Sequence, residues 1–169
     1  MAAIWLVSDT HFGHANIITY CSRPFSCVEE MDEAMVERWN RVVRPQDHVY
    51  HLGDVAMKAD RLGIVKRLHE HKRLVRGNHD IFKTKQYLAA GFDEIHGVRV
   101  LNGLVMTHIP IHPASLGRFV GNVHGHIHNN DGGDYGPRYL NVSVEMIDYA
   151  PITLEDAAER LRLRVERAA

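Results

Sequence analysis

Aspartate, asparagine and histidine side chains form five short groups within the first 128 residues of this 169-residue chain. In order, the groups are Asp9 with His11, Asp54, Asn78 with His79 and Asp80, His108, and His126 with His128. Carboxylate, amide and imidazole ligands together suit divalent Mn, Fe, Co, Ni or Zn, and the absence of thiolates from the groups argues against a cysteine-based structural zinc site. Imidazole is also the usual acid–base group near neutral pH. The groups therefore predict a metal-dependent catalytic site.

The first three groups each follow a short apolar stretch that is typical of a buried strand. These stretches are residues 2–8, 48–52 and 73–76. Because ligands in open α/β sheets bind beyond the carboxyl ends of the strands, we expect the five groups to meet in one cleft. Glycines precede the donors at Gly53, Gly77 and Gly125, where each would allow a sharp turn or a close approach of the backbone to a ligand.

Further helices and strands are expected to support this cleft. Their predicted positions are helices at 31–43, 62–69 and 154–165, and strands at 95–101, 104–107, 120–123 and 139–144. Asn102-Gly103 is a strong hairpin signal between two of these strands. Thr153 and Asp156 predict a capping box for the last helix. Its expected apolar stripe is Leu154, Ala158, Leu161 and Val165.

Length and composition set the class of protein. The chain has the length of one domain, and we predict a single α/β domain over 1–169 with two packed mixed sheets rather than one doubly wound sheet. A net charge of −1 gives no overall positive field for nucleic acid or anionic membranes. Cys21 and Cys27 fit no paired motif, which favours free thiols in a reducing compartment. Without a signal peptide or a run of 18 apolar residues, we expect a cytoplasmic protein that binds no membrane.

The order of the five groups resembles the pattern of the calcineurin-like metallophosphoesterase superfamily, which is Asp-x-His, Gly-Asp, Gly-Asn-His-Asp/Glu, a later His, and Gly-His-x-His. The matching residues are Asp9-Thr10-His11, Gly53-Asp54, Gly77-Asn78-His79-Asp80, His108 and Gly125-His126-Ile127-His128. Residues 9–17 and 141–145 also look like a compact subgroup of small bacterial and phage phosphoesterases. The resemblance implies a four-layer α/β/β/α sandwich of two mixed β-sheets flanked by helices, without a cap domain.

The same resemblance implies a dinuclear site in which Asp54 bridges two divalent cations. The first cation would be bound by Asp9, His11, Asp54 and His128. The second cation would be bound by Asp54, Asn78, His108 and His126. We favour Mn²⁺, with Zn²⁺, Fe, Ni²⁺ or Co²⁺ as alternatives, because similar ligands serve all of these metals. Such a site implies that a metal-bridging hydroxide attacks phosphorus directly, without a covalent phospho-enzyme.

His79 and Asp80 are the predicted catalytic residues. The resemblance implies that His79 lies beside the substrate phosphate, where it does acid–base or transition-state work, rather than on a metal. Asp80 would orient the His79 imidazole and raise its pKa, and it is equally suited to be the N-cap of the segment that follows.

Three residues are weaker candidates for substrate contact. His14 would reach the phosphate or cap the next helix, Arg23 would clamp the phosphate with two hydrogen bonds, and His112 would contact substrate or a carboxylate. Arg76 is a further candidate clamp, although pairing elsewhere on its strand is favoured. The remaining histidines are expected in strands, on a helix surface or in a hydrogen-bonded core. They are His48, His51, His69, His71, His96 and His124.

The expected activity is divalent-metal-dependent hydrolysis of small phosphate esters, with phosphodiesters, including nucleotide-type substrates, favoured over monoesters. A nuclease would use the same site but needs a basic track beside it, which only a local cluster such as Arg73, Arg76 and Arg118 would supply. A non-catalytic scaffold of the same fold is a third alternative, and it is disfavoured because none of the pattern's ligands is missing.

Overall fold

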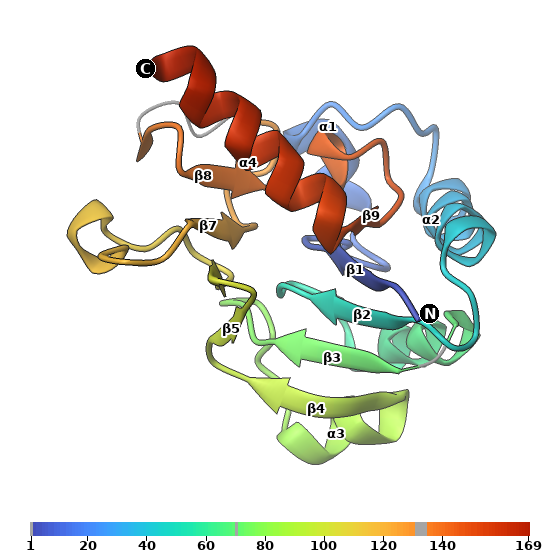
Figure 1. Cartoon of the computed structure of the whole chain (residues 1–169). Helices are drawn as coiled ribbons and strands as arrows, with labels where there is room; N and C mark the ends of the chain where they lie inside the picture. The colour runs from blue at the N-terminus through green and yellow to red at the C-terminus, as the bar shows by residue number, and fades with distance from the viewer. Residues whose placement is uncertain (1, 70, 131–134) are drawn as a thin grey trace.

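Two β-sheets with helices around them make up the described residues, 2–69, 71–130 and 135–169, of the computed structural model (Figure 1). The strands are β1 (Ile4–Val7), β2 (His48–His51), β3 (Lys72–Val75), β4 (Phe92–His96), β5 (Arg99–Leu101), β6 (Leu104–Met106), β7 (Gly121–His124), β8 (Tyr139–Asn141) and β9 (Ile152–Thr153). The α-helices are α1 (Ala15–Tyr20), α2 (Val28–Val42), α3 (Thr84–Ala90) and α4 (Leu154–Ala168), and three 3₁₀ helices are η1 (Ala59–Arg67), η2 (Pro113–Ser115) and η4 (Val144–Met146).

The first sheet has the strand order β4-β3-β2-β1-β9, and the second has the order β5-β6-β7-β8. Strands β1 to β4 are parallel to one another, whereas β9 is antiparallel to β1. In the second sheet β6, β7 and β8 are parallel and β5 is antiparallel to β6. Both sheets are therefore mixed, and the carboxyl ends of the parallel strands in each sheet lie along one edge.

The two sheets meet where β1 and β8 end. The Ser8 amide donates to the Val142 carbonyl at 2.9 Å, and the Val144 amide donates to the Ser8 carbonyl at 3.0 Å. Leu6 and Leu74 of the first sheet and Val123 of the second are fully buried in one apolar core. Helix α4 packs on β1, β8 and β9, while α3 packs on β4 and η1. The predicted α/β fold of two mixed sheets flanked by helices is confirmed.

One predicted strand is wrong, because residues 95–101 contribute to both sheets. Ile95 and His96 end β4 in the first sheet, and Arg99 begins β5 in the second. Apolar residues continue on both sides of Gly97, so hydrophobic pattern alone does not show where the chain leaves one sheet for the other. The predicted hairpin is confirmed, since Leu101 pairs with Leu104 across Asn102-Gly103.

Two predicted helices also differ from the structure. The helix expected around 62–69 is a 3₁₀ helix that ends at Arg67. In α4 the Thr153 hydroxyl accepts a hydrogen bond from the Asp156 amide at 3.0 Å, as the capping box predicted. The buried residues of α4 include Ala157 rather than Ala158, and Val165 is exposed, so the expected stripe is wrong at those two positions.

The described part of the chain contains no helix with both the length and the apolar character that a membrane crossing requires. Cys21, which is buried, and Cys27, which is exposed, are both free.

Candidate metal centre

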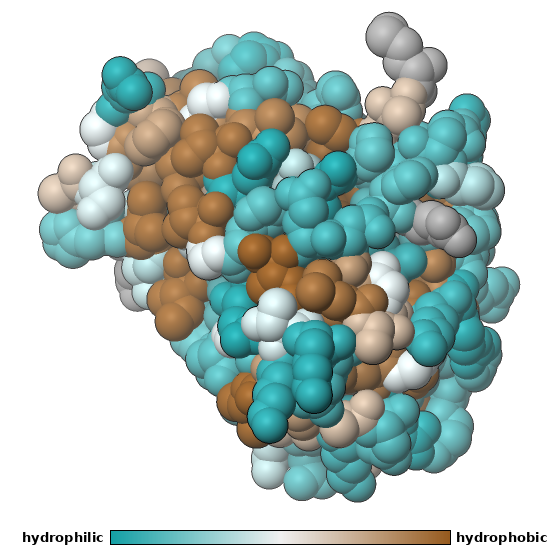
Figure 2. All heavy atoms as spheres, turned by 90° about the horizontal axis from the view of Figure 1, so that it is seen from below, coloured by the Kyte–Doolittle hydropathy of each residue, from teal (hydrophilic) through white to brown (hydrophobic). Residues whose placement is uncertain are grey.

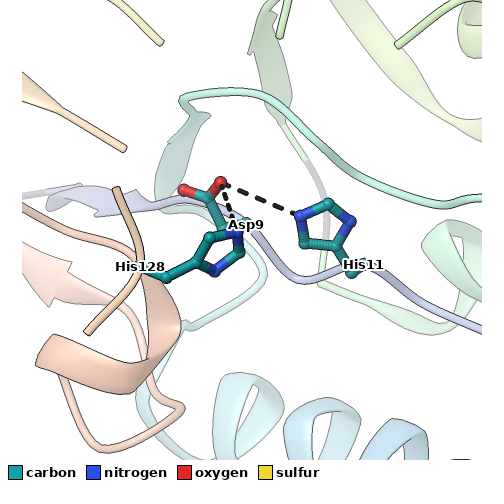
Figure 3. A group of neighbouring side chains, drawn as sticks. All are labelled: Asp9, His11 and His128. Carbon is teal, nitrogen blue, oxygen red and sulfur yellow. Dashed lines mark ion pairs between the residues drawn. The ribbon is translucent and has the colours of Figure 1, made fainter. Parts of the chain in front are cut away.

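The predicted ligands follow the ends of five parallel strands. Asp9 and His11 follow β1, Asp54 follows β2 and Asn78 follows β3. The second sheet supplies the others: His108 follows β6, and His126 and His128 follow β7. Two triads of predicted ligands have possible ligand atoms within 4.8 Å of one another, Asp9 with His11 and His128, and Asp54 with His108 and His126, and a third group with such atoms joins His128 to Cys21 and Glu145. Figure 3 shows the first triad, whose three side chains come from two loops and point toward one another.

The Asp9 carboxylate has one oxygen that is hydrogen-bonded and one that is not. Oδ2 accepts hydrogen bonds from the His126 amide and the Ser143 hydroxyl, both at 2.9 Å. Oδ1 is buried without a hydrogen-bond partner among the described residues, and it lies 3.9 Å from Nε2 of both His11 and His128. A buried, unsatisfied carboxylate oxygen is costly. A cation bound by these three side chains would remove that cost, so the residues fit a metal.

Asp54 lies between the predicted ligands of the first cation and those of the second, which we call the two halves of the site. Its Oδ1 accepts a hydrogen bond from the His79 amide at 2.8 Å. Its Oδ2 lies 3.6 Å from His11 Nε2 and 3.3 Å from His108 Nε2. His108 Nε2 is also 2.8 Å from Asn78 Oδ1, which brings the amide ligand to the second half. One carboxylate oxygen therefore faces ligands of both predicted cations.

The ligands have an unusual backbone conformation. Asp9, His11, Asp54, His126 and His128 all have a positive φ, between 50° and 73°. Residues other than glycine rarely adopt this left-handed region, and each instance costs about 1–3 kcal/mol. Such strain persists only where the surrounding structure holds it, and it concentrates at functional sites. The backbone strain at these residues lowers the stability of the fold, and it sets the direction in which their side chains point.

Two glycines allow the backbone to approach the carboxylates. A Cβ atom on Gly77 would lie 2.3 Å from Asp54 Oδ1, and one on Gly125 would lie 2.2 Å from Asp9 Oδ2. Both distances are far below van der Waals contact. The close approach that the sequence predicted at these two positions is confirmed.

Burial and neighbouring charges set the protonation of the ligands. Burial lowers the pKa of His11 to about 3, which keeps its imidazole neutral and able to coordinate at neutral pH. Burial alone would raise the pKa of Asp54, but the hydrogen bond and charge of His108 lower it to about 2. Burial lowers the pKa of His128, but contacts with Cys21 and Glu145 outweigh it and raise the pKa to about 10. A metal at His128 would therefore displace a proton.

Comparison with known proteins identifies the family. The uncharacterized protein MJ1445 of Methanocaldococcus jannaschii is 39% identical over 164 residues, which cover 92% of this chain and 89% of the relative. The protein of unknown function AQ665 from Aquifex aeolicus has a solved structure that is 30% identical, with a TM-score of 0.75 over 94% of this chain and 99% of that one. No protein-family model matches.

A second solved structure, the Pseudomonas putida nuclease MPE, shares the fold with a TM-score of 0.51 at 22% identity, over 74% of this chain and 61% of that one. The chain therefore belongs to the same family as MJ1445 and AQ665, and it shares its fold with this nuclease. The two triads of this chain could each hold a metal ion.

The side chains of His79 and Asp80 differ in exposure, since His79 is exposed and Asp80 is buried. The His79 side chain is exposed, and its ring centroid lies 5.6 Å from that of His11, so the imidazole is accessible to a substrate above the site. Asp80 is buried, and its carboxylate accepts hydrogen bonds from the amides of Gly77 and Asp54 at 2.8 Å and Val55 at 3.0 Å. Asp80 thus joins the loops after β2 and β3. The predicted N-cap role is wrong, because α3 begins after Lys83.

Arg23 was predicted to clamp the substrate phosphate, and the structure contradicts this. Its side chain is completely buried and pairs with Glu145 at 2.7 Å. It also donates to the backbone carbonyls of Asp9 and Thr10. Glu145 Oε1 lies 3.1 Å from His128 Nδ1 as well. A carboxylate on the second nitrogen of a metal-binding histidine fixes its ring orientation and tautomer. Arg23 and Glu145 therefore position ligands from beneath the site.

Sequence reasoning assigned no role to Ser143 and Glu145, although it noted the stretch 141–145. Both act through contacts with residues far away in the chain. The hydroxyl of Ser143 contacts Asp9, and the carboxylate of Glu145 contacts Arg23 and His128.

The two remaining substrate candidates differ in exposure. His14 precedes α1 without a side-chain capping bond, so the capping alternative is wrong. Its ring is 5.6 Å from that of His11, beside the first triad. His112 is exposed, and its Nδ1 accepts a hydrogen bond from the Ala114 amide at 3.2 Å, where it caps η2. The structure thus places His14 beside the first triad, whereas His112 caps the short helix η2.

Two of the three arginines in the basic cluster predicted for a nuclease, Arg73 and Arg76, have local partners. Arg73 pairs with Glu94 and lies over the Tyr50 ring. Arg76 donates to the Phe82 carbonyl. The side chains of Arg73 and Arg76 therefore contact neighbouring residues on or near β3. For Arg76, the sequence had favoured such pairing over a contact with phosphate.

Proposed function

We propose that this protein is a calcineurin-like metallophosphoesterase, that it hydrolyses small phosphate esters with two divalent cations, Mn²⁺ preferred, and that phosphodiesters are favoured over monoesters. The observation that supports this most is the position of Asp54 Oδ2, between His11 Nε2 at 3.6 Å and His108 Nε2 at 3.3 Å. A carboxylate oxygen shared in this way is suited to a pair of cations. The unsatisfied Asp9 Oδ1 beside His11 and His128 supports the same assignment.

When bound, the two cations would supply Lewis-acid activation of water and would neutralise charge on the phosphoryl oxygens. The chain itself would provide the other functions. Asp9, His11 and His128 would bind the first cation, Asn78, His108 and His126 the second, and Asp54 both.

His79 would act on the substrate. Its backbone amide is fixed on Asp54 Oδ1, while its imidazole is exposed above the ligands. An imidazole in this position would donate a proton to the departing ester oxygen or stabilise the charge on the phosphoryl group. His14, half-buried beside His11, would contact a phosphoryl oxygen from the other side.

The test is hydrolysis of bis(p-nitrophenyl) phosphate by protein that has been stripped with chelator and reloaded with each of Mn²⁺, Zn²⁺, Fe²⁺, Ni²⁺ and Co²⁺. Wild-type protein should turn over with at least one metal, and Asp54→Ala should not. Asp60→Ala, which removes an exposed carboxylate on η1, is the matched control and should retain full turnover. Undiminished hydrolysis by the Asp54 variant would exclude the proposed site.

A further inference from the structure

A cavity of about 500 Å³ opens beside the second half of the metal centre. Two predicted ligands, Asn78 and His108, form one of its walls. Arg76, Gly97 and Ile109 line it elsewhere. The volume lies within the range of pockets that bind small organic ligands. A phosphate held at the metal centre would therefore have room for one of its ester arms in this cavity.

The outer wall of the cavity is apolar and exposed. Ile109, which lines the cavity, has 51% of its surface exposed. Val98 does not line the cavity, but it follows the lining residue Gly97 and has 53% of its surface exposed. The view from below in Figure 2 shows apolar surface gathered on the left, the side on which β5 and β7 lie in Figure 1. Exposed apolar groups beside a cleft favour a ligand that removes them from water.

Arg76, which is among the residues that line the cavity, carries a positive charge. Its guanidinium donates to the Phe82 carbonyl at 3.0 Å and lies 5.2 Å from the centre of the Tyr87 ring. Among the described residues it has no carboxylate partner in an ion pair. A side-chain cation that the protein does not neutralise favours an anionic ligand, such as a phosphate ester whose negative charge lies close to its apolar ester arm.

We propose that this cavity is a subsite for a ring-sized apolar ester arm, so that the substrate is an aryl or nucleoside ester whose phosphate lies on the metals. The inference rests on the proposed function and deepens it. Gly97 lines the cavity without a side chain, and a Cβ atom built on it meets no atom within 4 Å. A larger side chain at this position would take up space that the ester arm needs. Ile109 would pack against the face of the ring.

Gly97 provides a test that leaves the metal ligands unchanged. Gly97→Phe should fill the cavity, and because the residue has an ordinary φ and open space the variant should fold. Gly63→Phe is the matched control, because a Cβ there also meets nothing within 4 Å and Gly63 lies in η1, outside the cavity lining. Metal content by mass spectrometry and the unfolding temperature should be the same in all three proteins.

The readout is binding of methyl phosphate and phenyl phosphate to Mn²⁺-loaded protein by calorimetry. Burial of a ring should make phenyl phosphate bind wild-type protein about tenfold more tightly than methyl phosphate. Gly97→Phe should abolish this preference without changing methyl phosphate affinity, whereas Gly63→Phe should retain it. Ile109→Ser, at an exposed position, should reduce the preference severalfold.

The same experiment separates the two hypotheses. If wild-type protein binds and hydrolyses phosphate esters but does not distinguish the two phosphates, or if Gly97→Phe keeps the wild-type preference, the subsite is wrong and the proposed function stands. If metal-loaded wild-type protein binds neither phosphate and hydrolyses no ester, the proposed function fails, and the subsite fails with it.

Discussion

Replacing Glu145 by glutamine should reveal how strongly the fold beneath the metal centre depends on one charge. Oε1 of Glu145 lies 2.7 Å from Arg23 Nη2, 2.8 Å from Arg23 Nε and 3.1 Å from His128 Nδ1. The Arg23 side chain is 0% exposed and that of Glu145 is 4% exposed. Glu145→Gln keeps the shape of the side chain but leaves the Arg23 charge buried without a counter-charge.

Removing one partner of a buried ion pair costs about 3–5 kcal/mol. We expect a loss near the lower limit, about 3 kcal/mol, because a glutamine oxygen still accepts a hydrogen bond and the Asp9 and Thr10 carbonyls still accept from Arg23. For a chain of this length such a loss lowers the unfolding temperature by about 6–12 °C. Metal affinity should also fall about 10–100-fold, because His128 loses the carboxylate that orients it.

The assay is thermal unfolding of metal-free protein by circular dichroism, followed by metal titration calorimetry. Glu33→Gln is the matched control. It removes the Arg67–Glu33 pair, which has two hydrogen bonds but side chains that are 48% and 61% exposed. Exposed pairs contribute about 0.2–1 kcal/mol, so the control should unfold close to the wild-type temperature and bind metal normally. Equal losses in the two variants would refute the argument from burial.

Three further predictions concern catalysis, pH and packing. His79→Gln should lower turnover about 10²–10⁴-fold with unchanged metal content, and loss of metal would contradict a role on the substrate. Burial lowers the pKa of His51 from its usual 6.5 to about 3, so between these values the unfolded chain binds a proton that the folded chain does not. The free energy of unfolding of metal-free protein should therefore fall as pH decreases from about 6.5, and His51 should contribute about 1.4 kcal/mol per pH unit to this fall. Urea titrations at pH 7 and pH 5 should show a smaller pH dependence for His51→Gln than for wild-type protein. Gly125→Ala places a Cβ 2.0 Å from Ser8 Oγ, so it should lower both the unfolding temperature and metal affinity, whereas Gly63→Ala should lower neither.

The His51 prediction depends on a tautomer that the hydrogen bonds fix. Nδ1 accepts from the Gly53 amide at 3.2 Å, so the proton is on Nε2, which donates to the Thr10 hydroxyl at 3.0 Å. The Thr10 hydroxyl in turn donates to the Val55 carbonyl. Burial is the main reason that the folded protein resists protonation at His51. A proton on Nδ1 would also break the hydrogen bond from the Gly53 amide.

The positions of the candidate ligands in the fold were predictable from sequence because they depend on local order. Each group stands directly after a short apolar strand, and parallel strands bring such positions to one edge of a sheet. Gly77 and Gly125 were predictable for the same reason, since the backbone must approach the carboxylates immediately beside the ligand.

The support beneath the ligands was not predictable in this way. Arg23 precedes a proline in a polar stretch, which suggested an exposed phosphate clamp, and only a carboxylate 122 residues away accounts for its burial. Ser143 contacts Asp9 across 134 residues. Such long-range pairs have no periodicity and no local signal. The same limit applies to residues 95–101, where a change of sheet leaves the apolar pattern uninterrupted.

Because the candidate ligands are divided between the two sheets, bound metals would connect the sheets to each other. Asp9, His11, Asp54 and Asn78 extend from the first sheet, whereas His108, His126 and His128 extend from the second. Each cation would thus cross-link the sheets at the border where Ser8 meets Val142 and Val144. Chelation should therefore loosen that border before it affects the centres of β2 and β3. Amide hydrogen exchange at Ser8 and Val144 would then report metal occupancy even when no substrate is present.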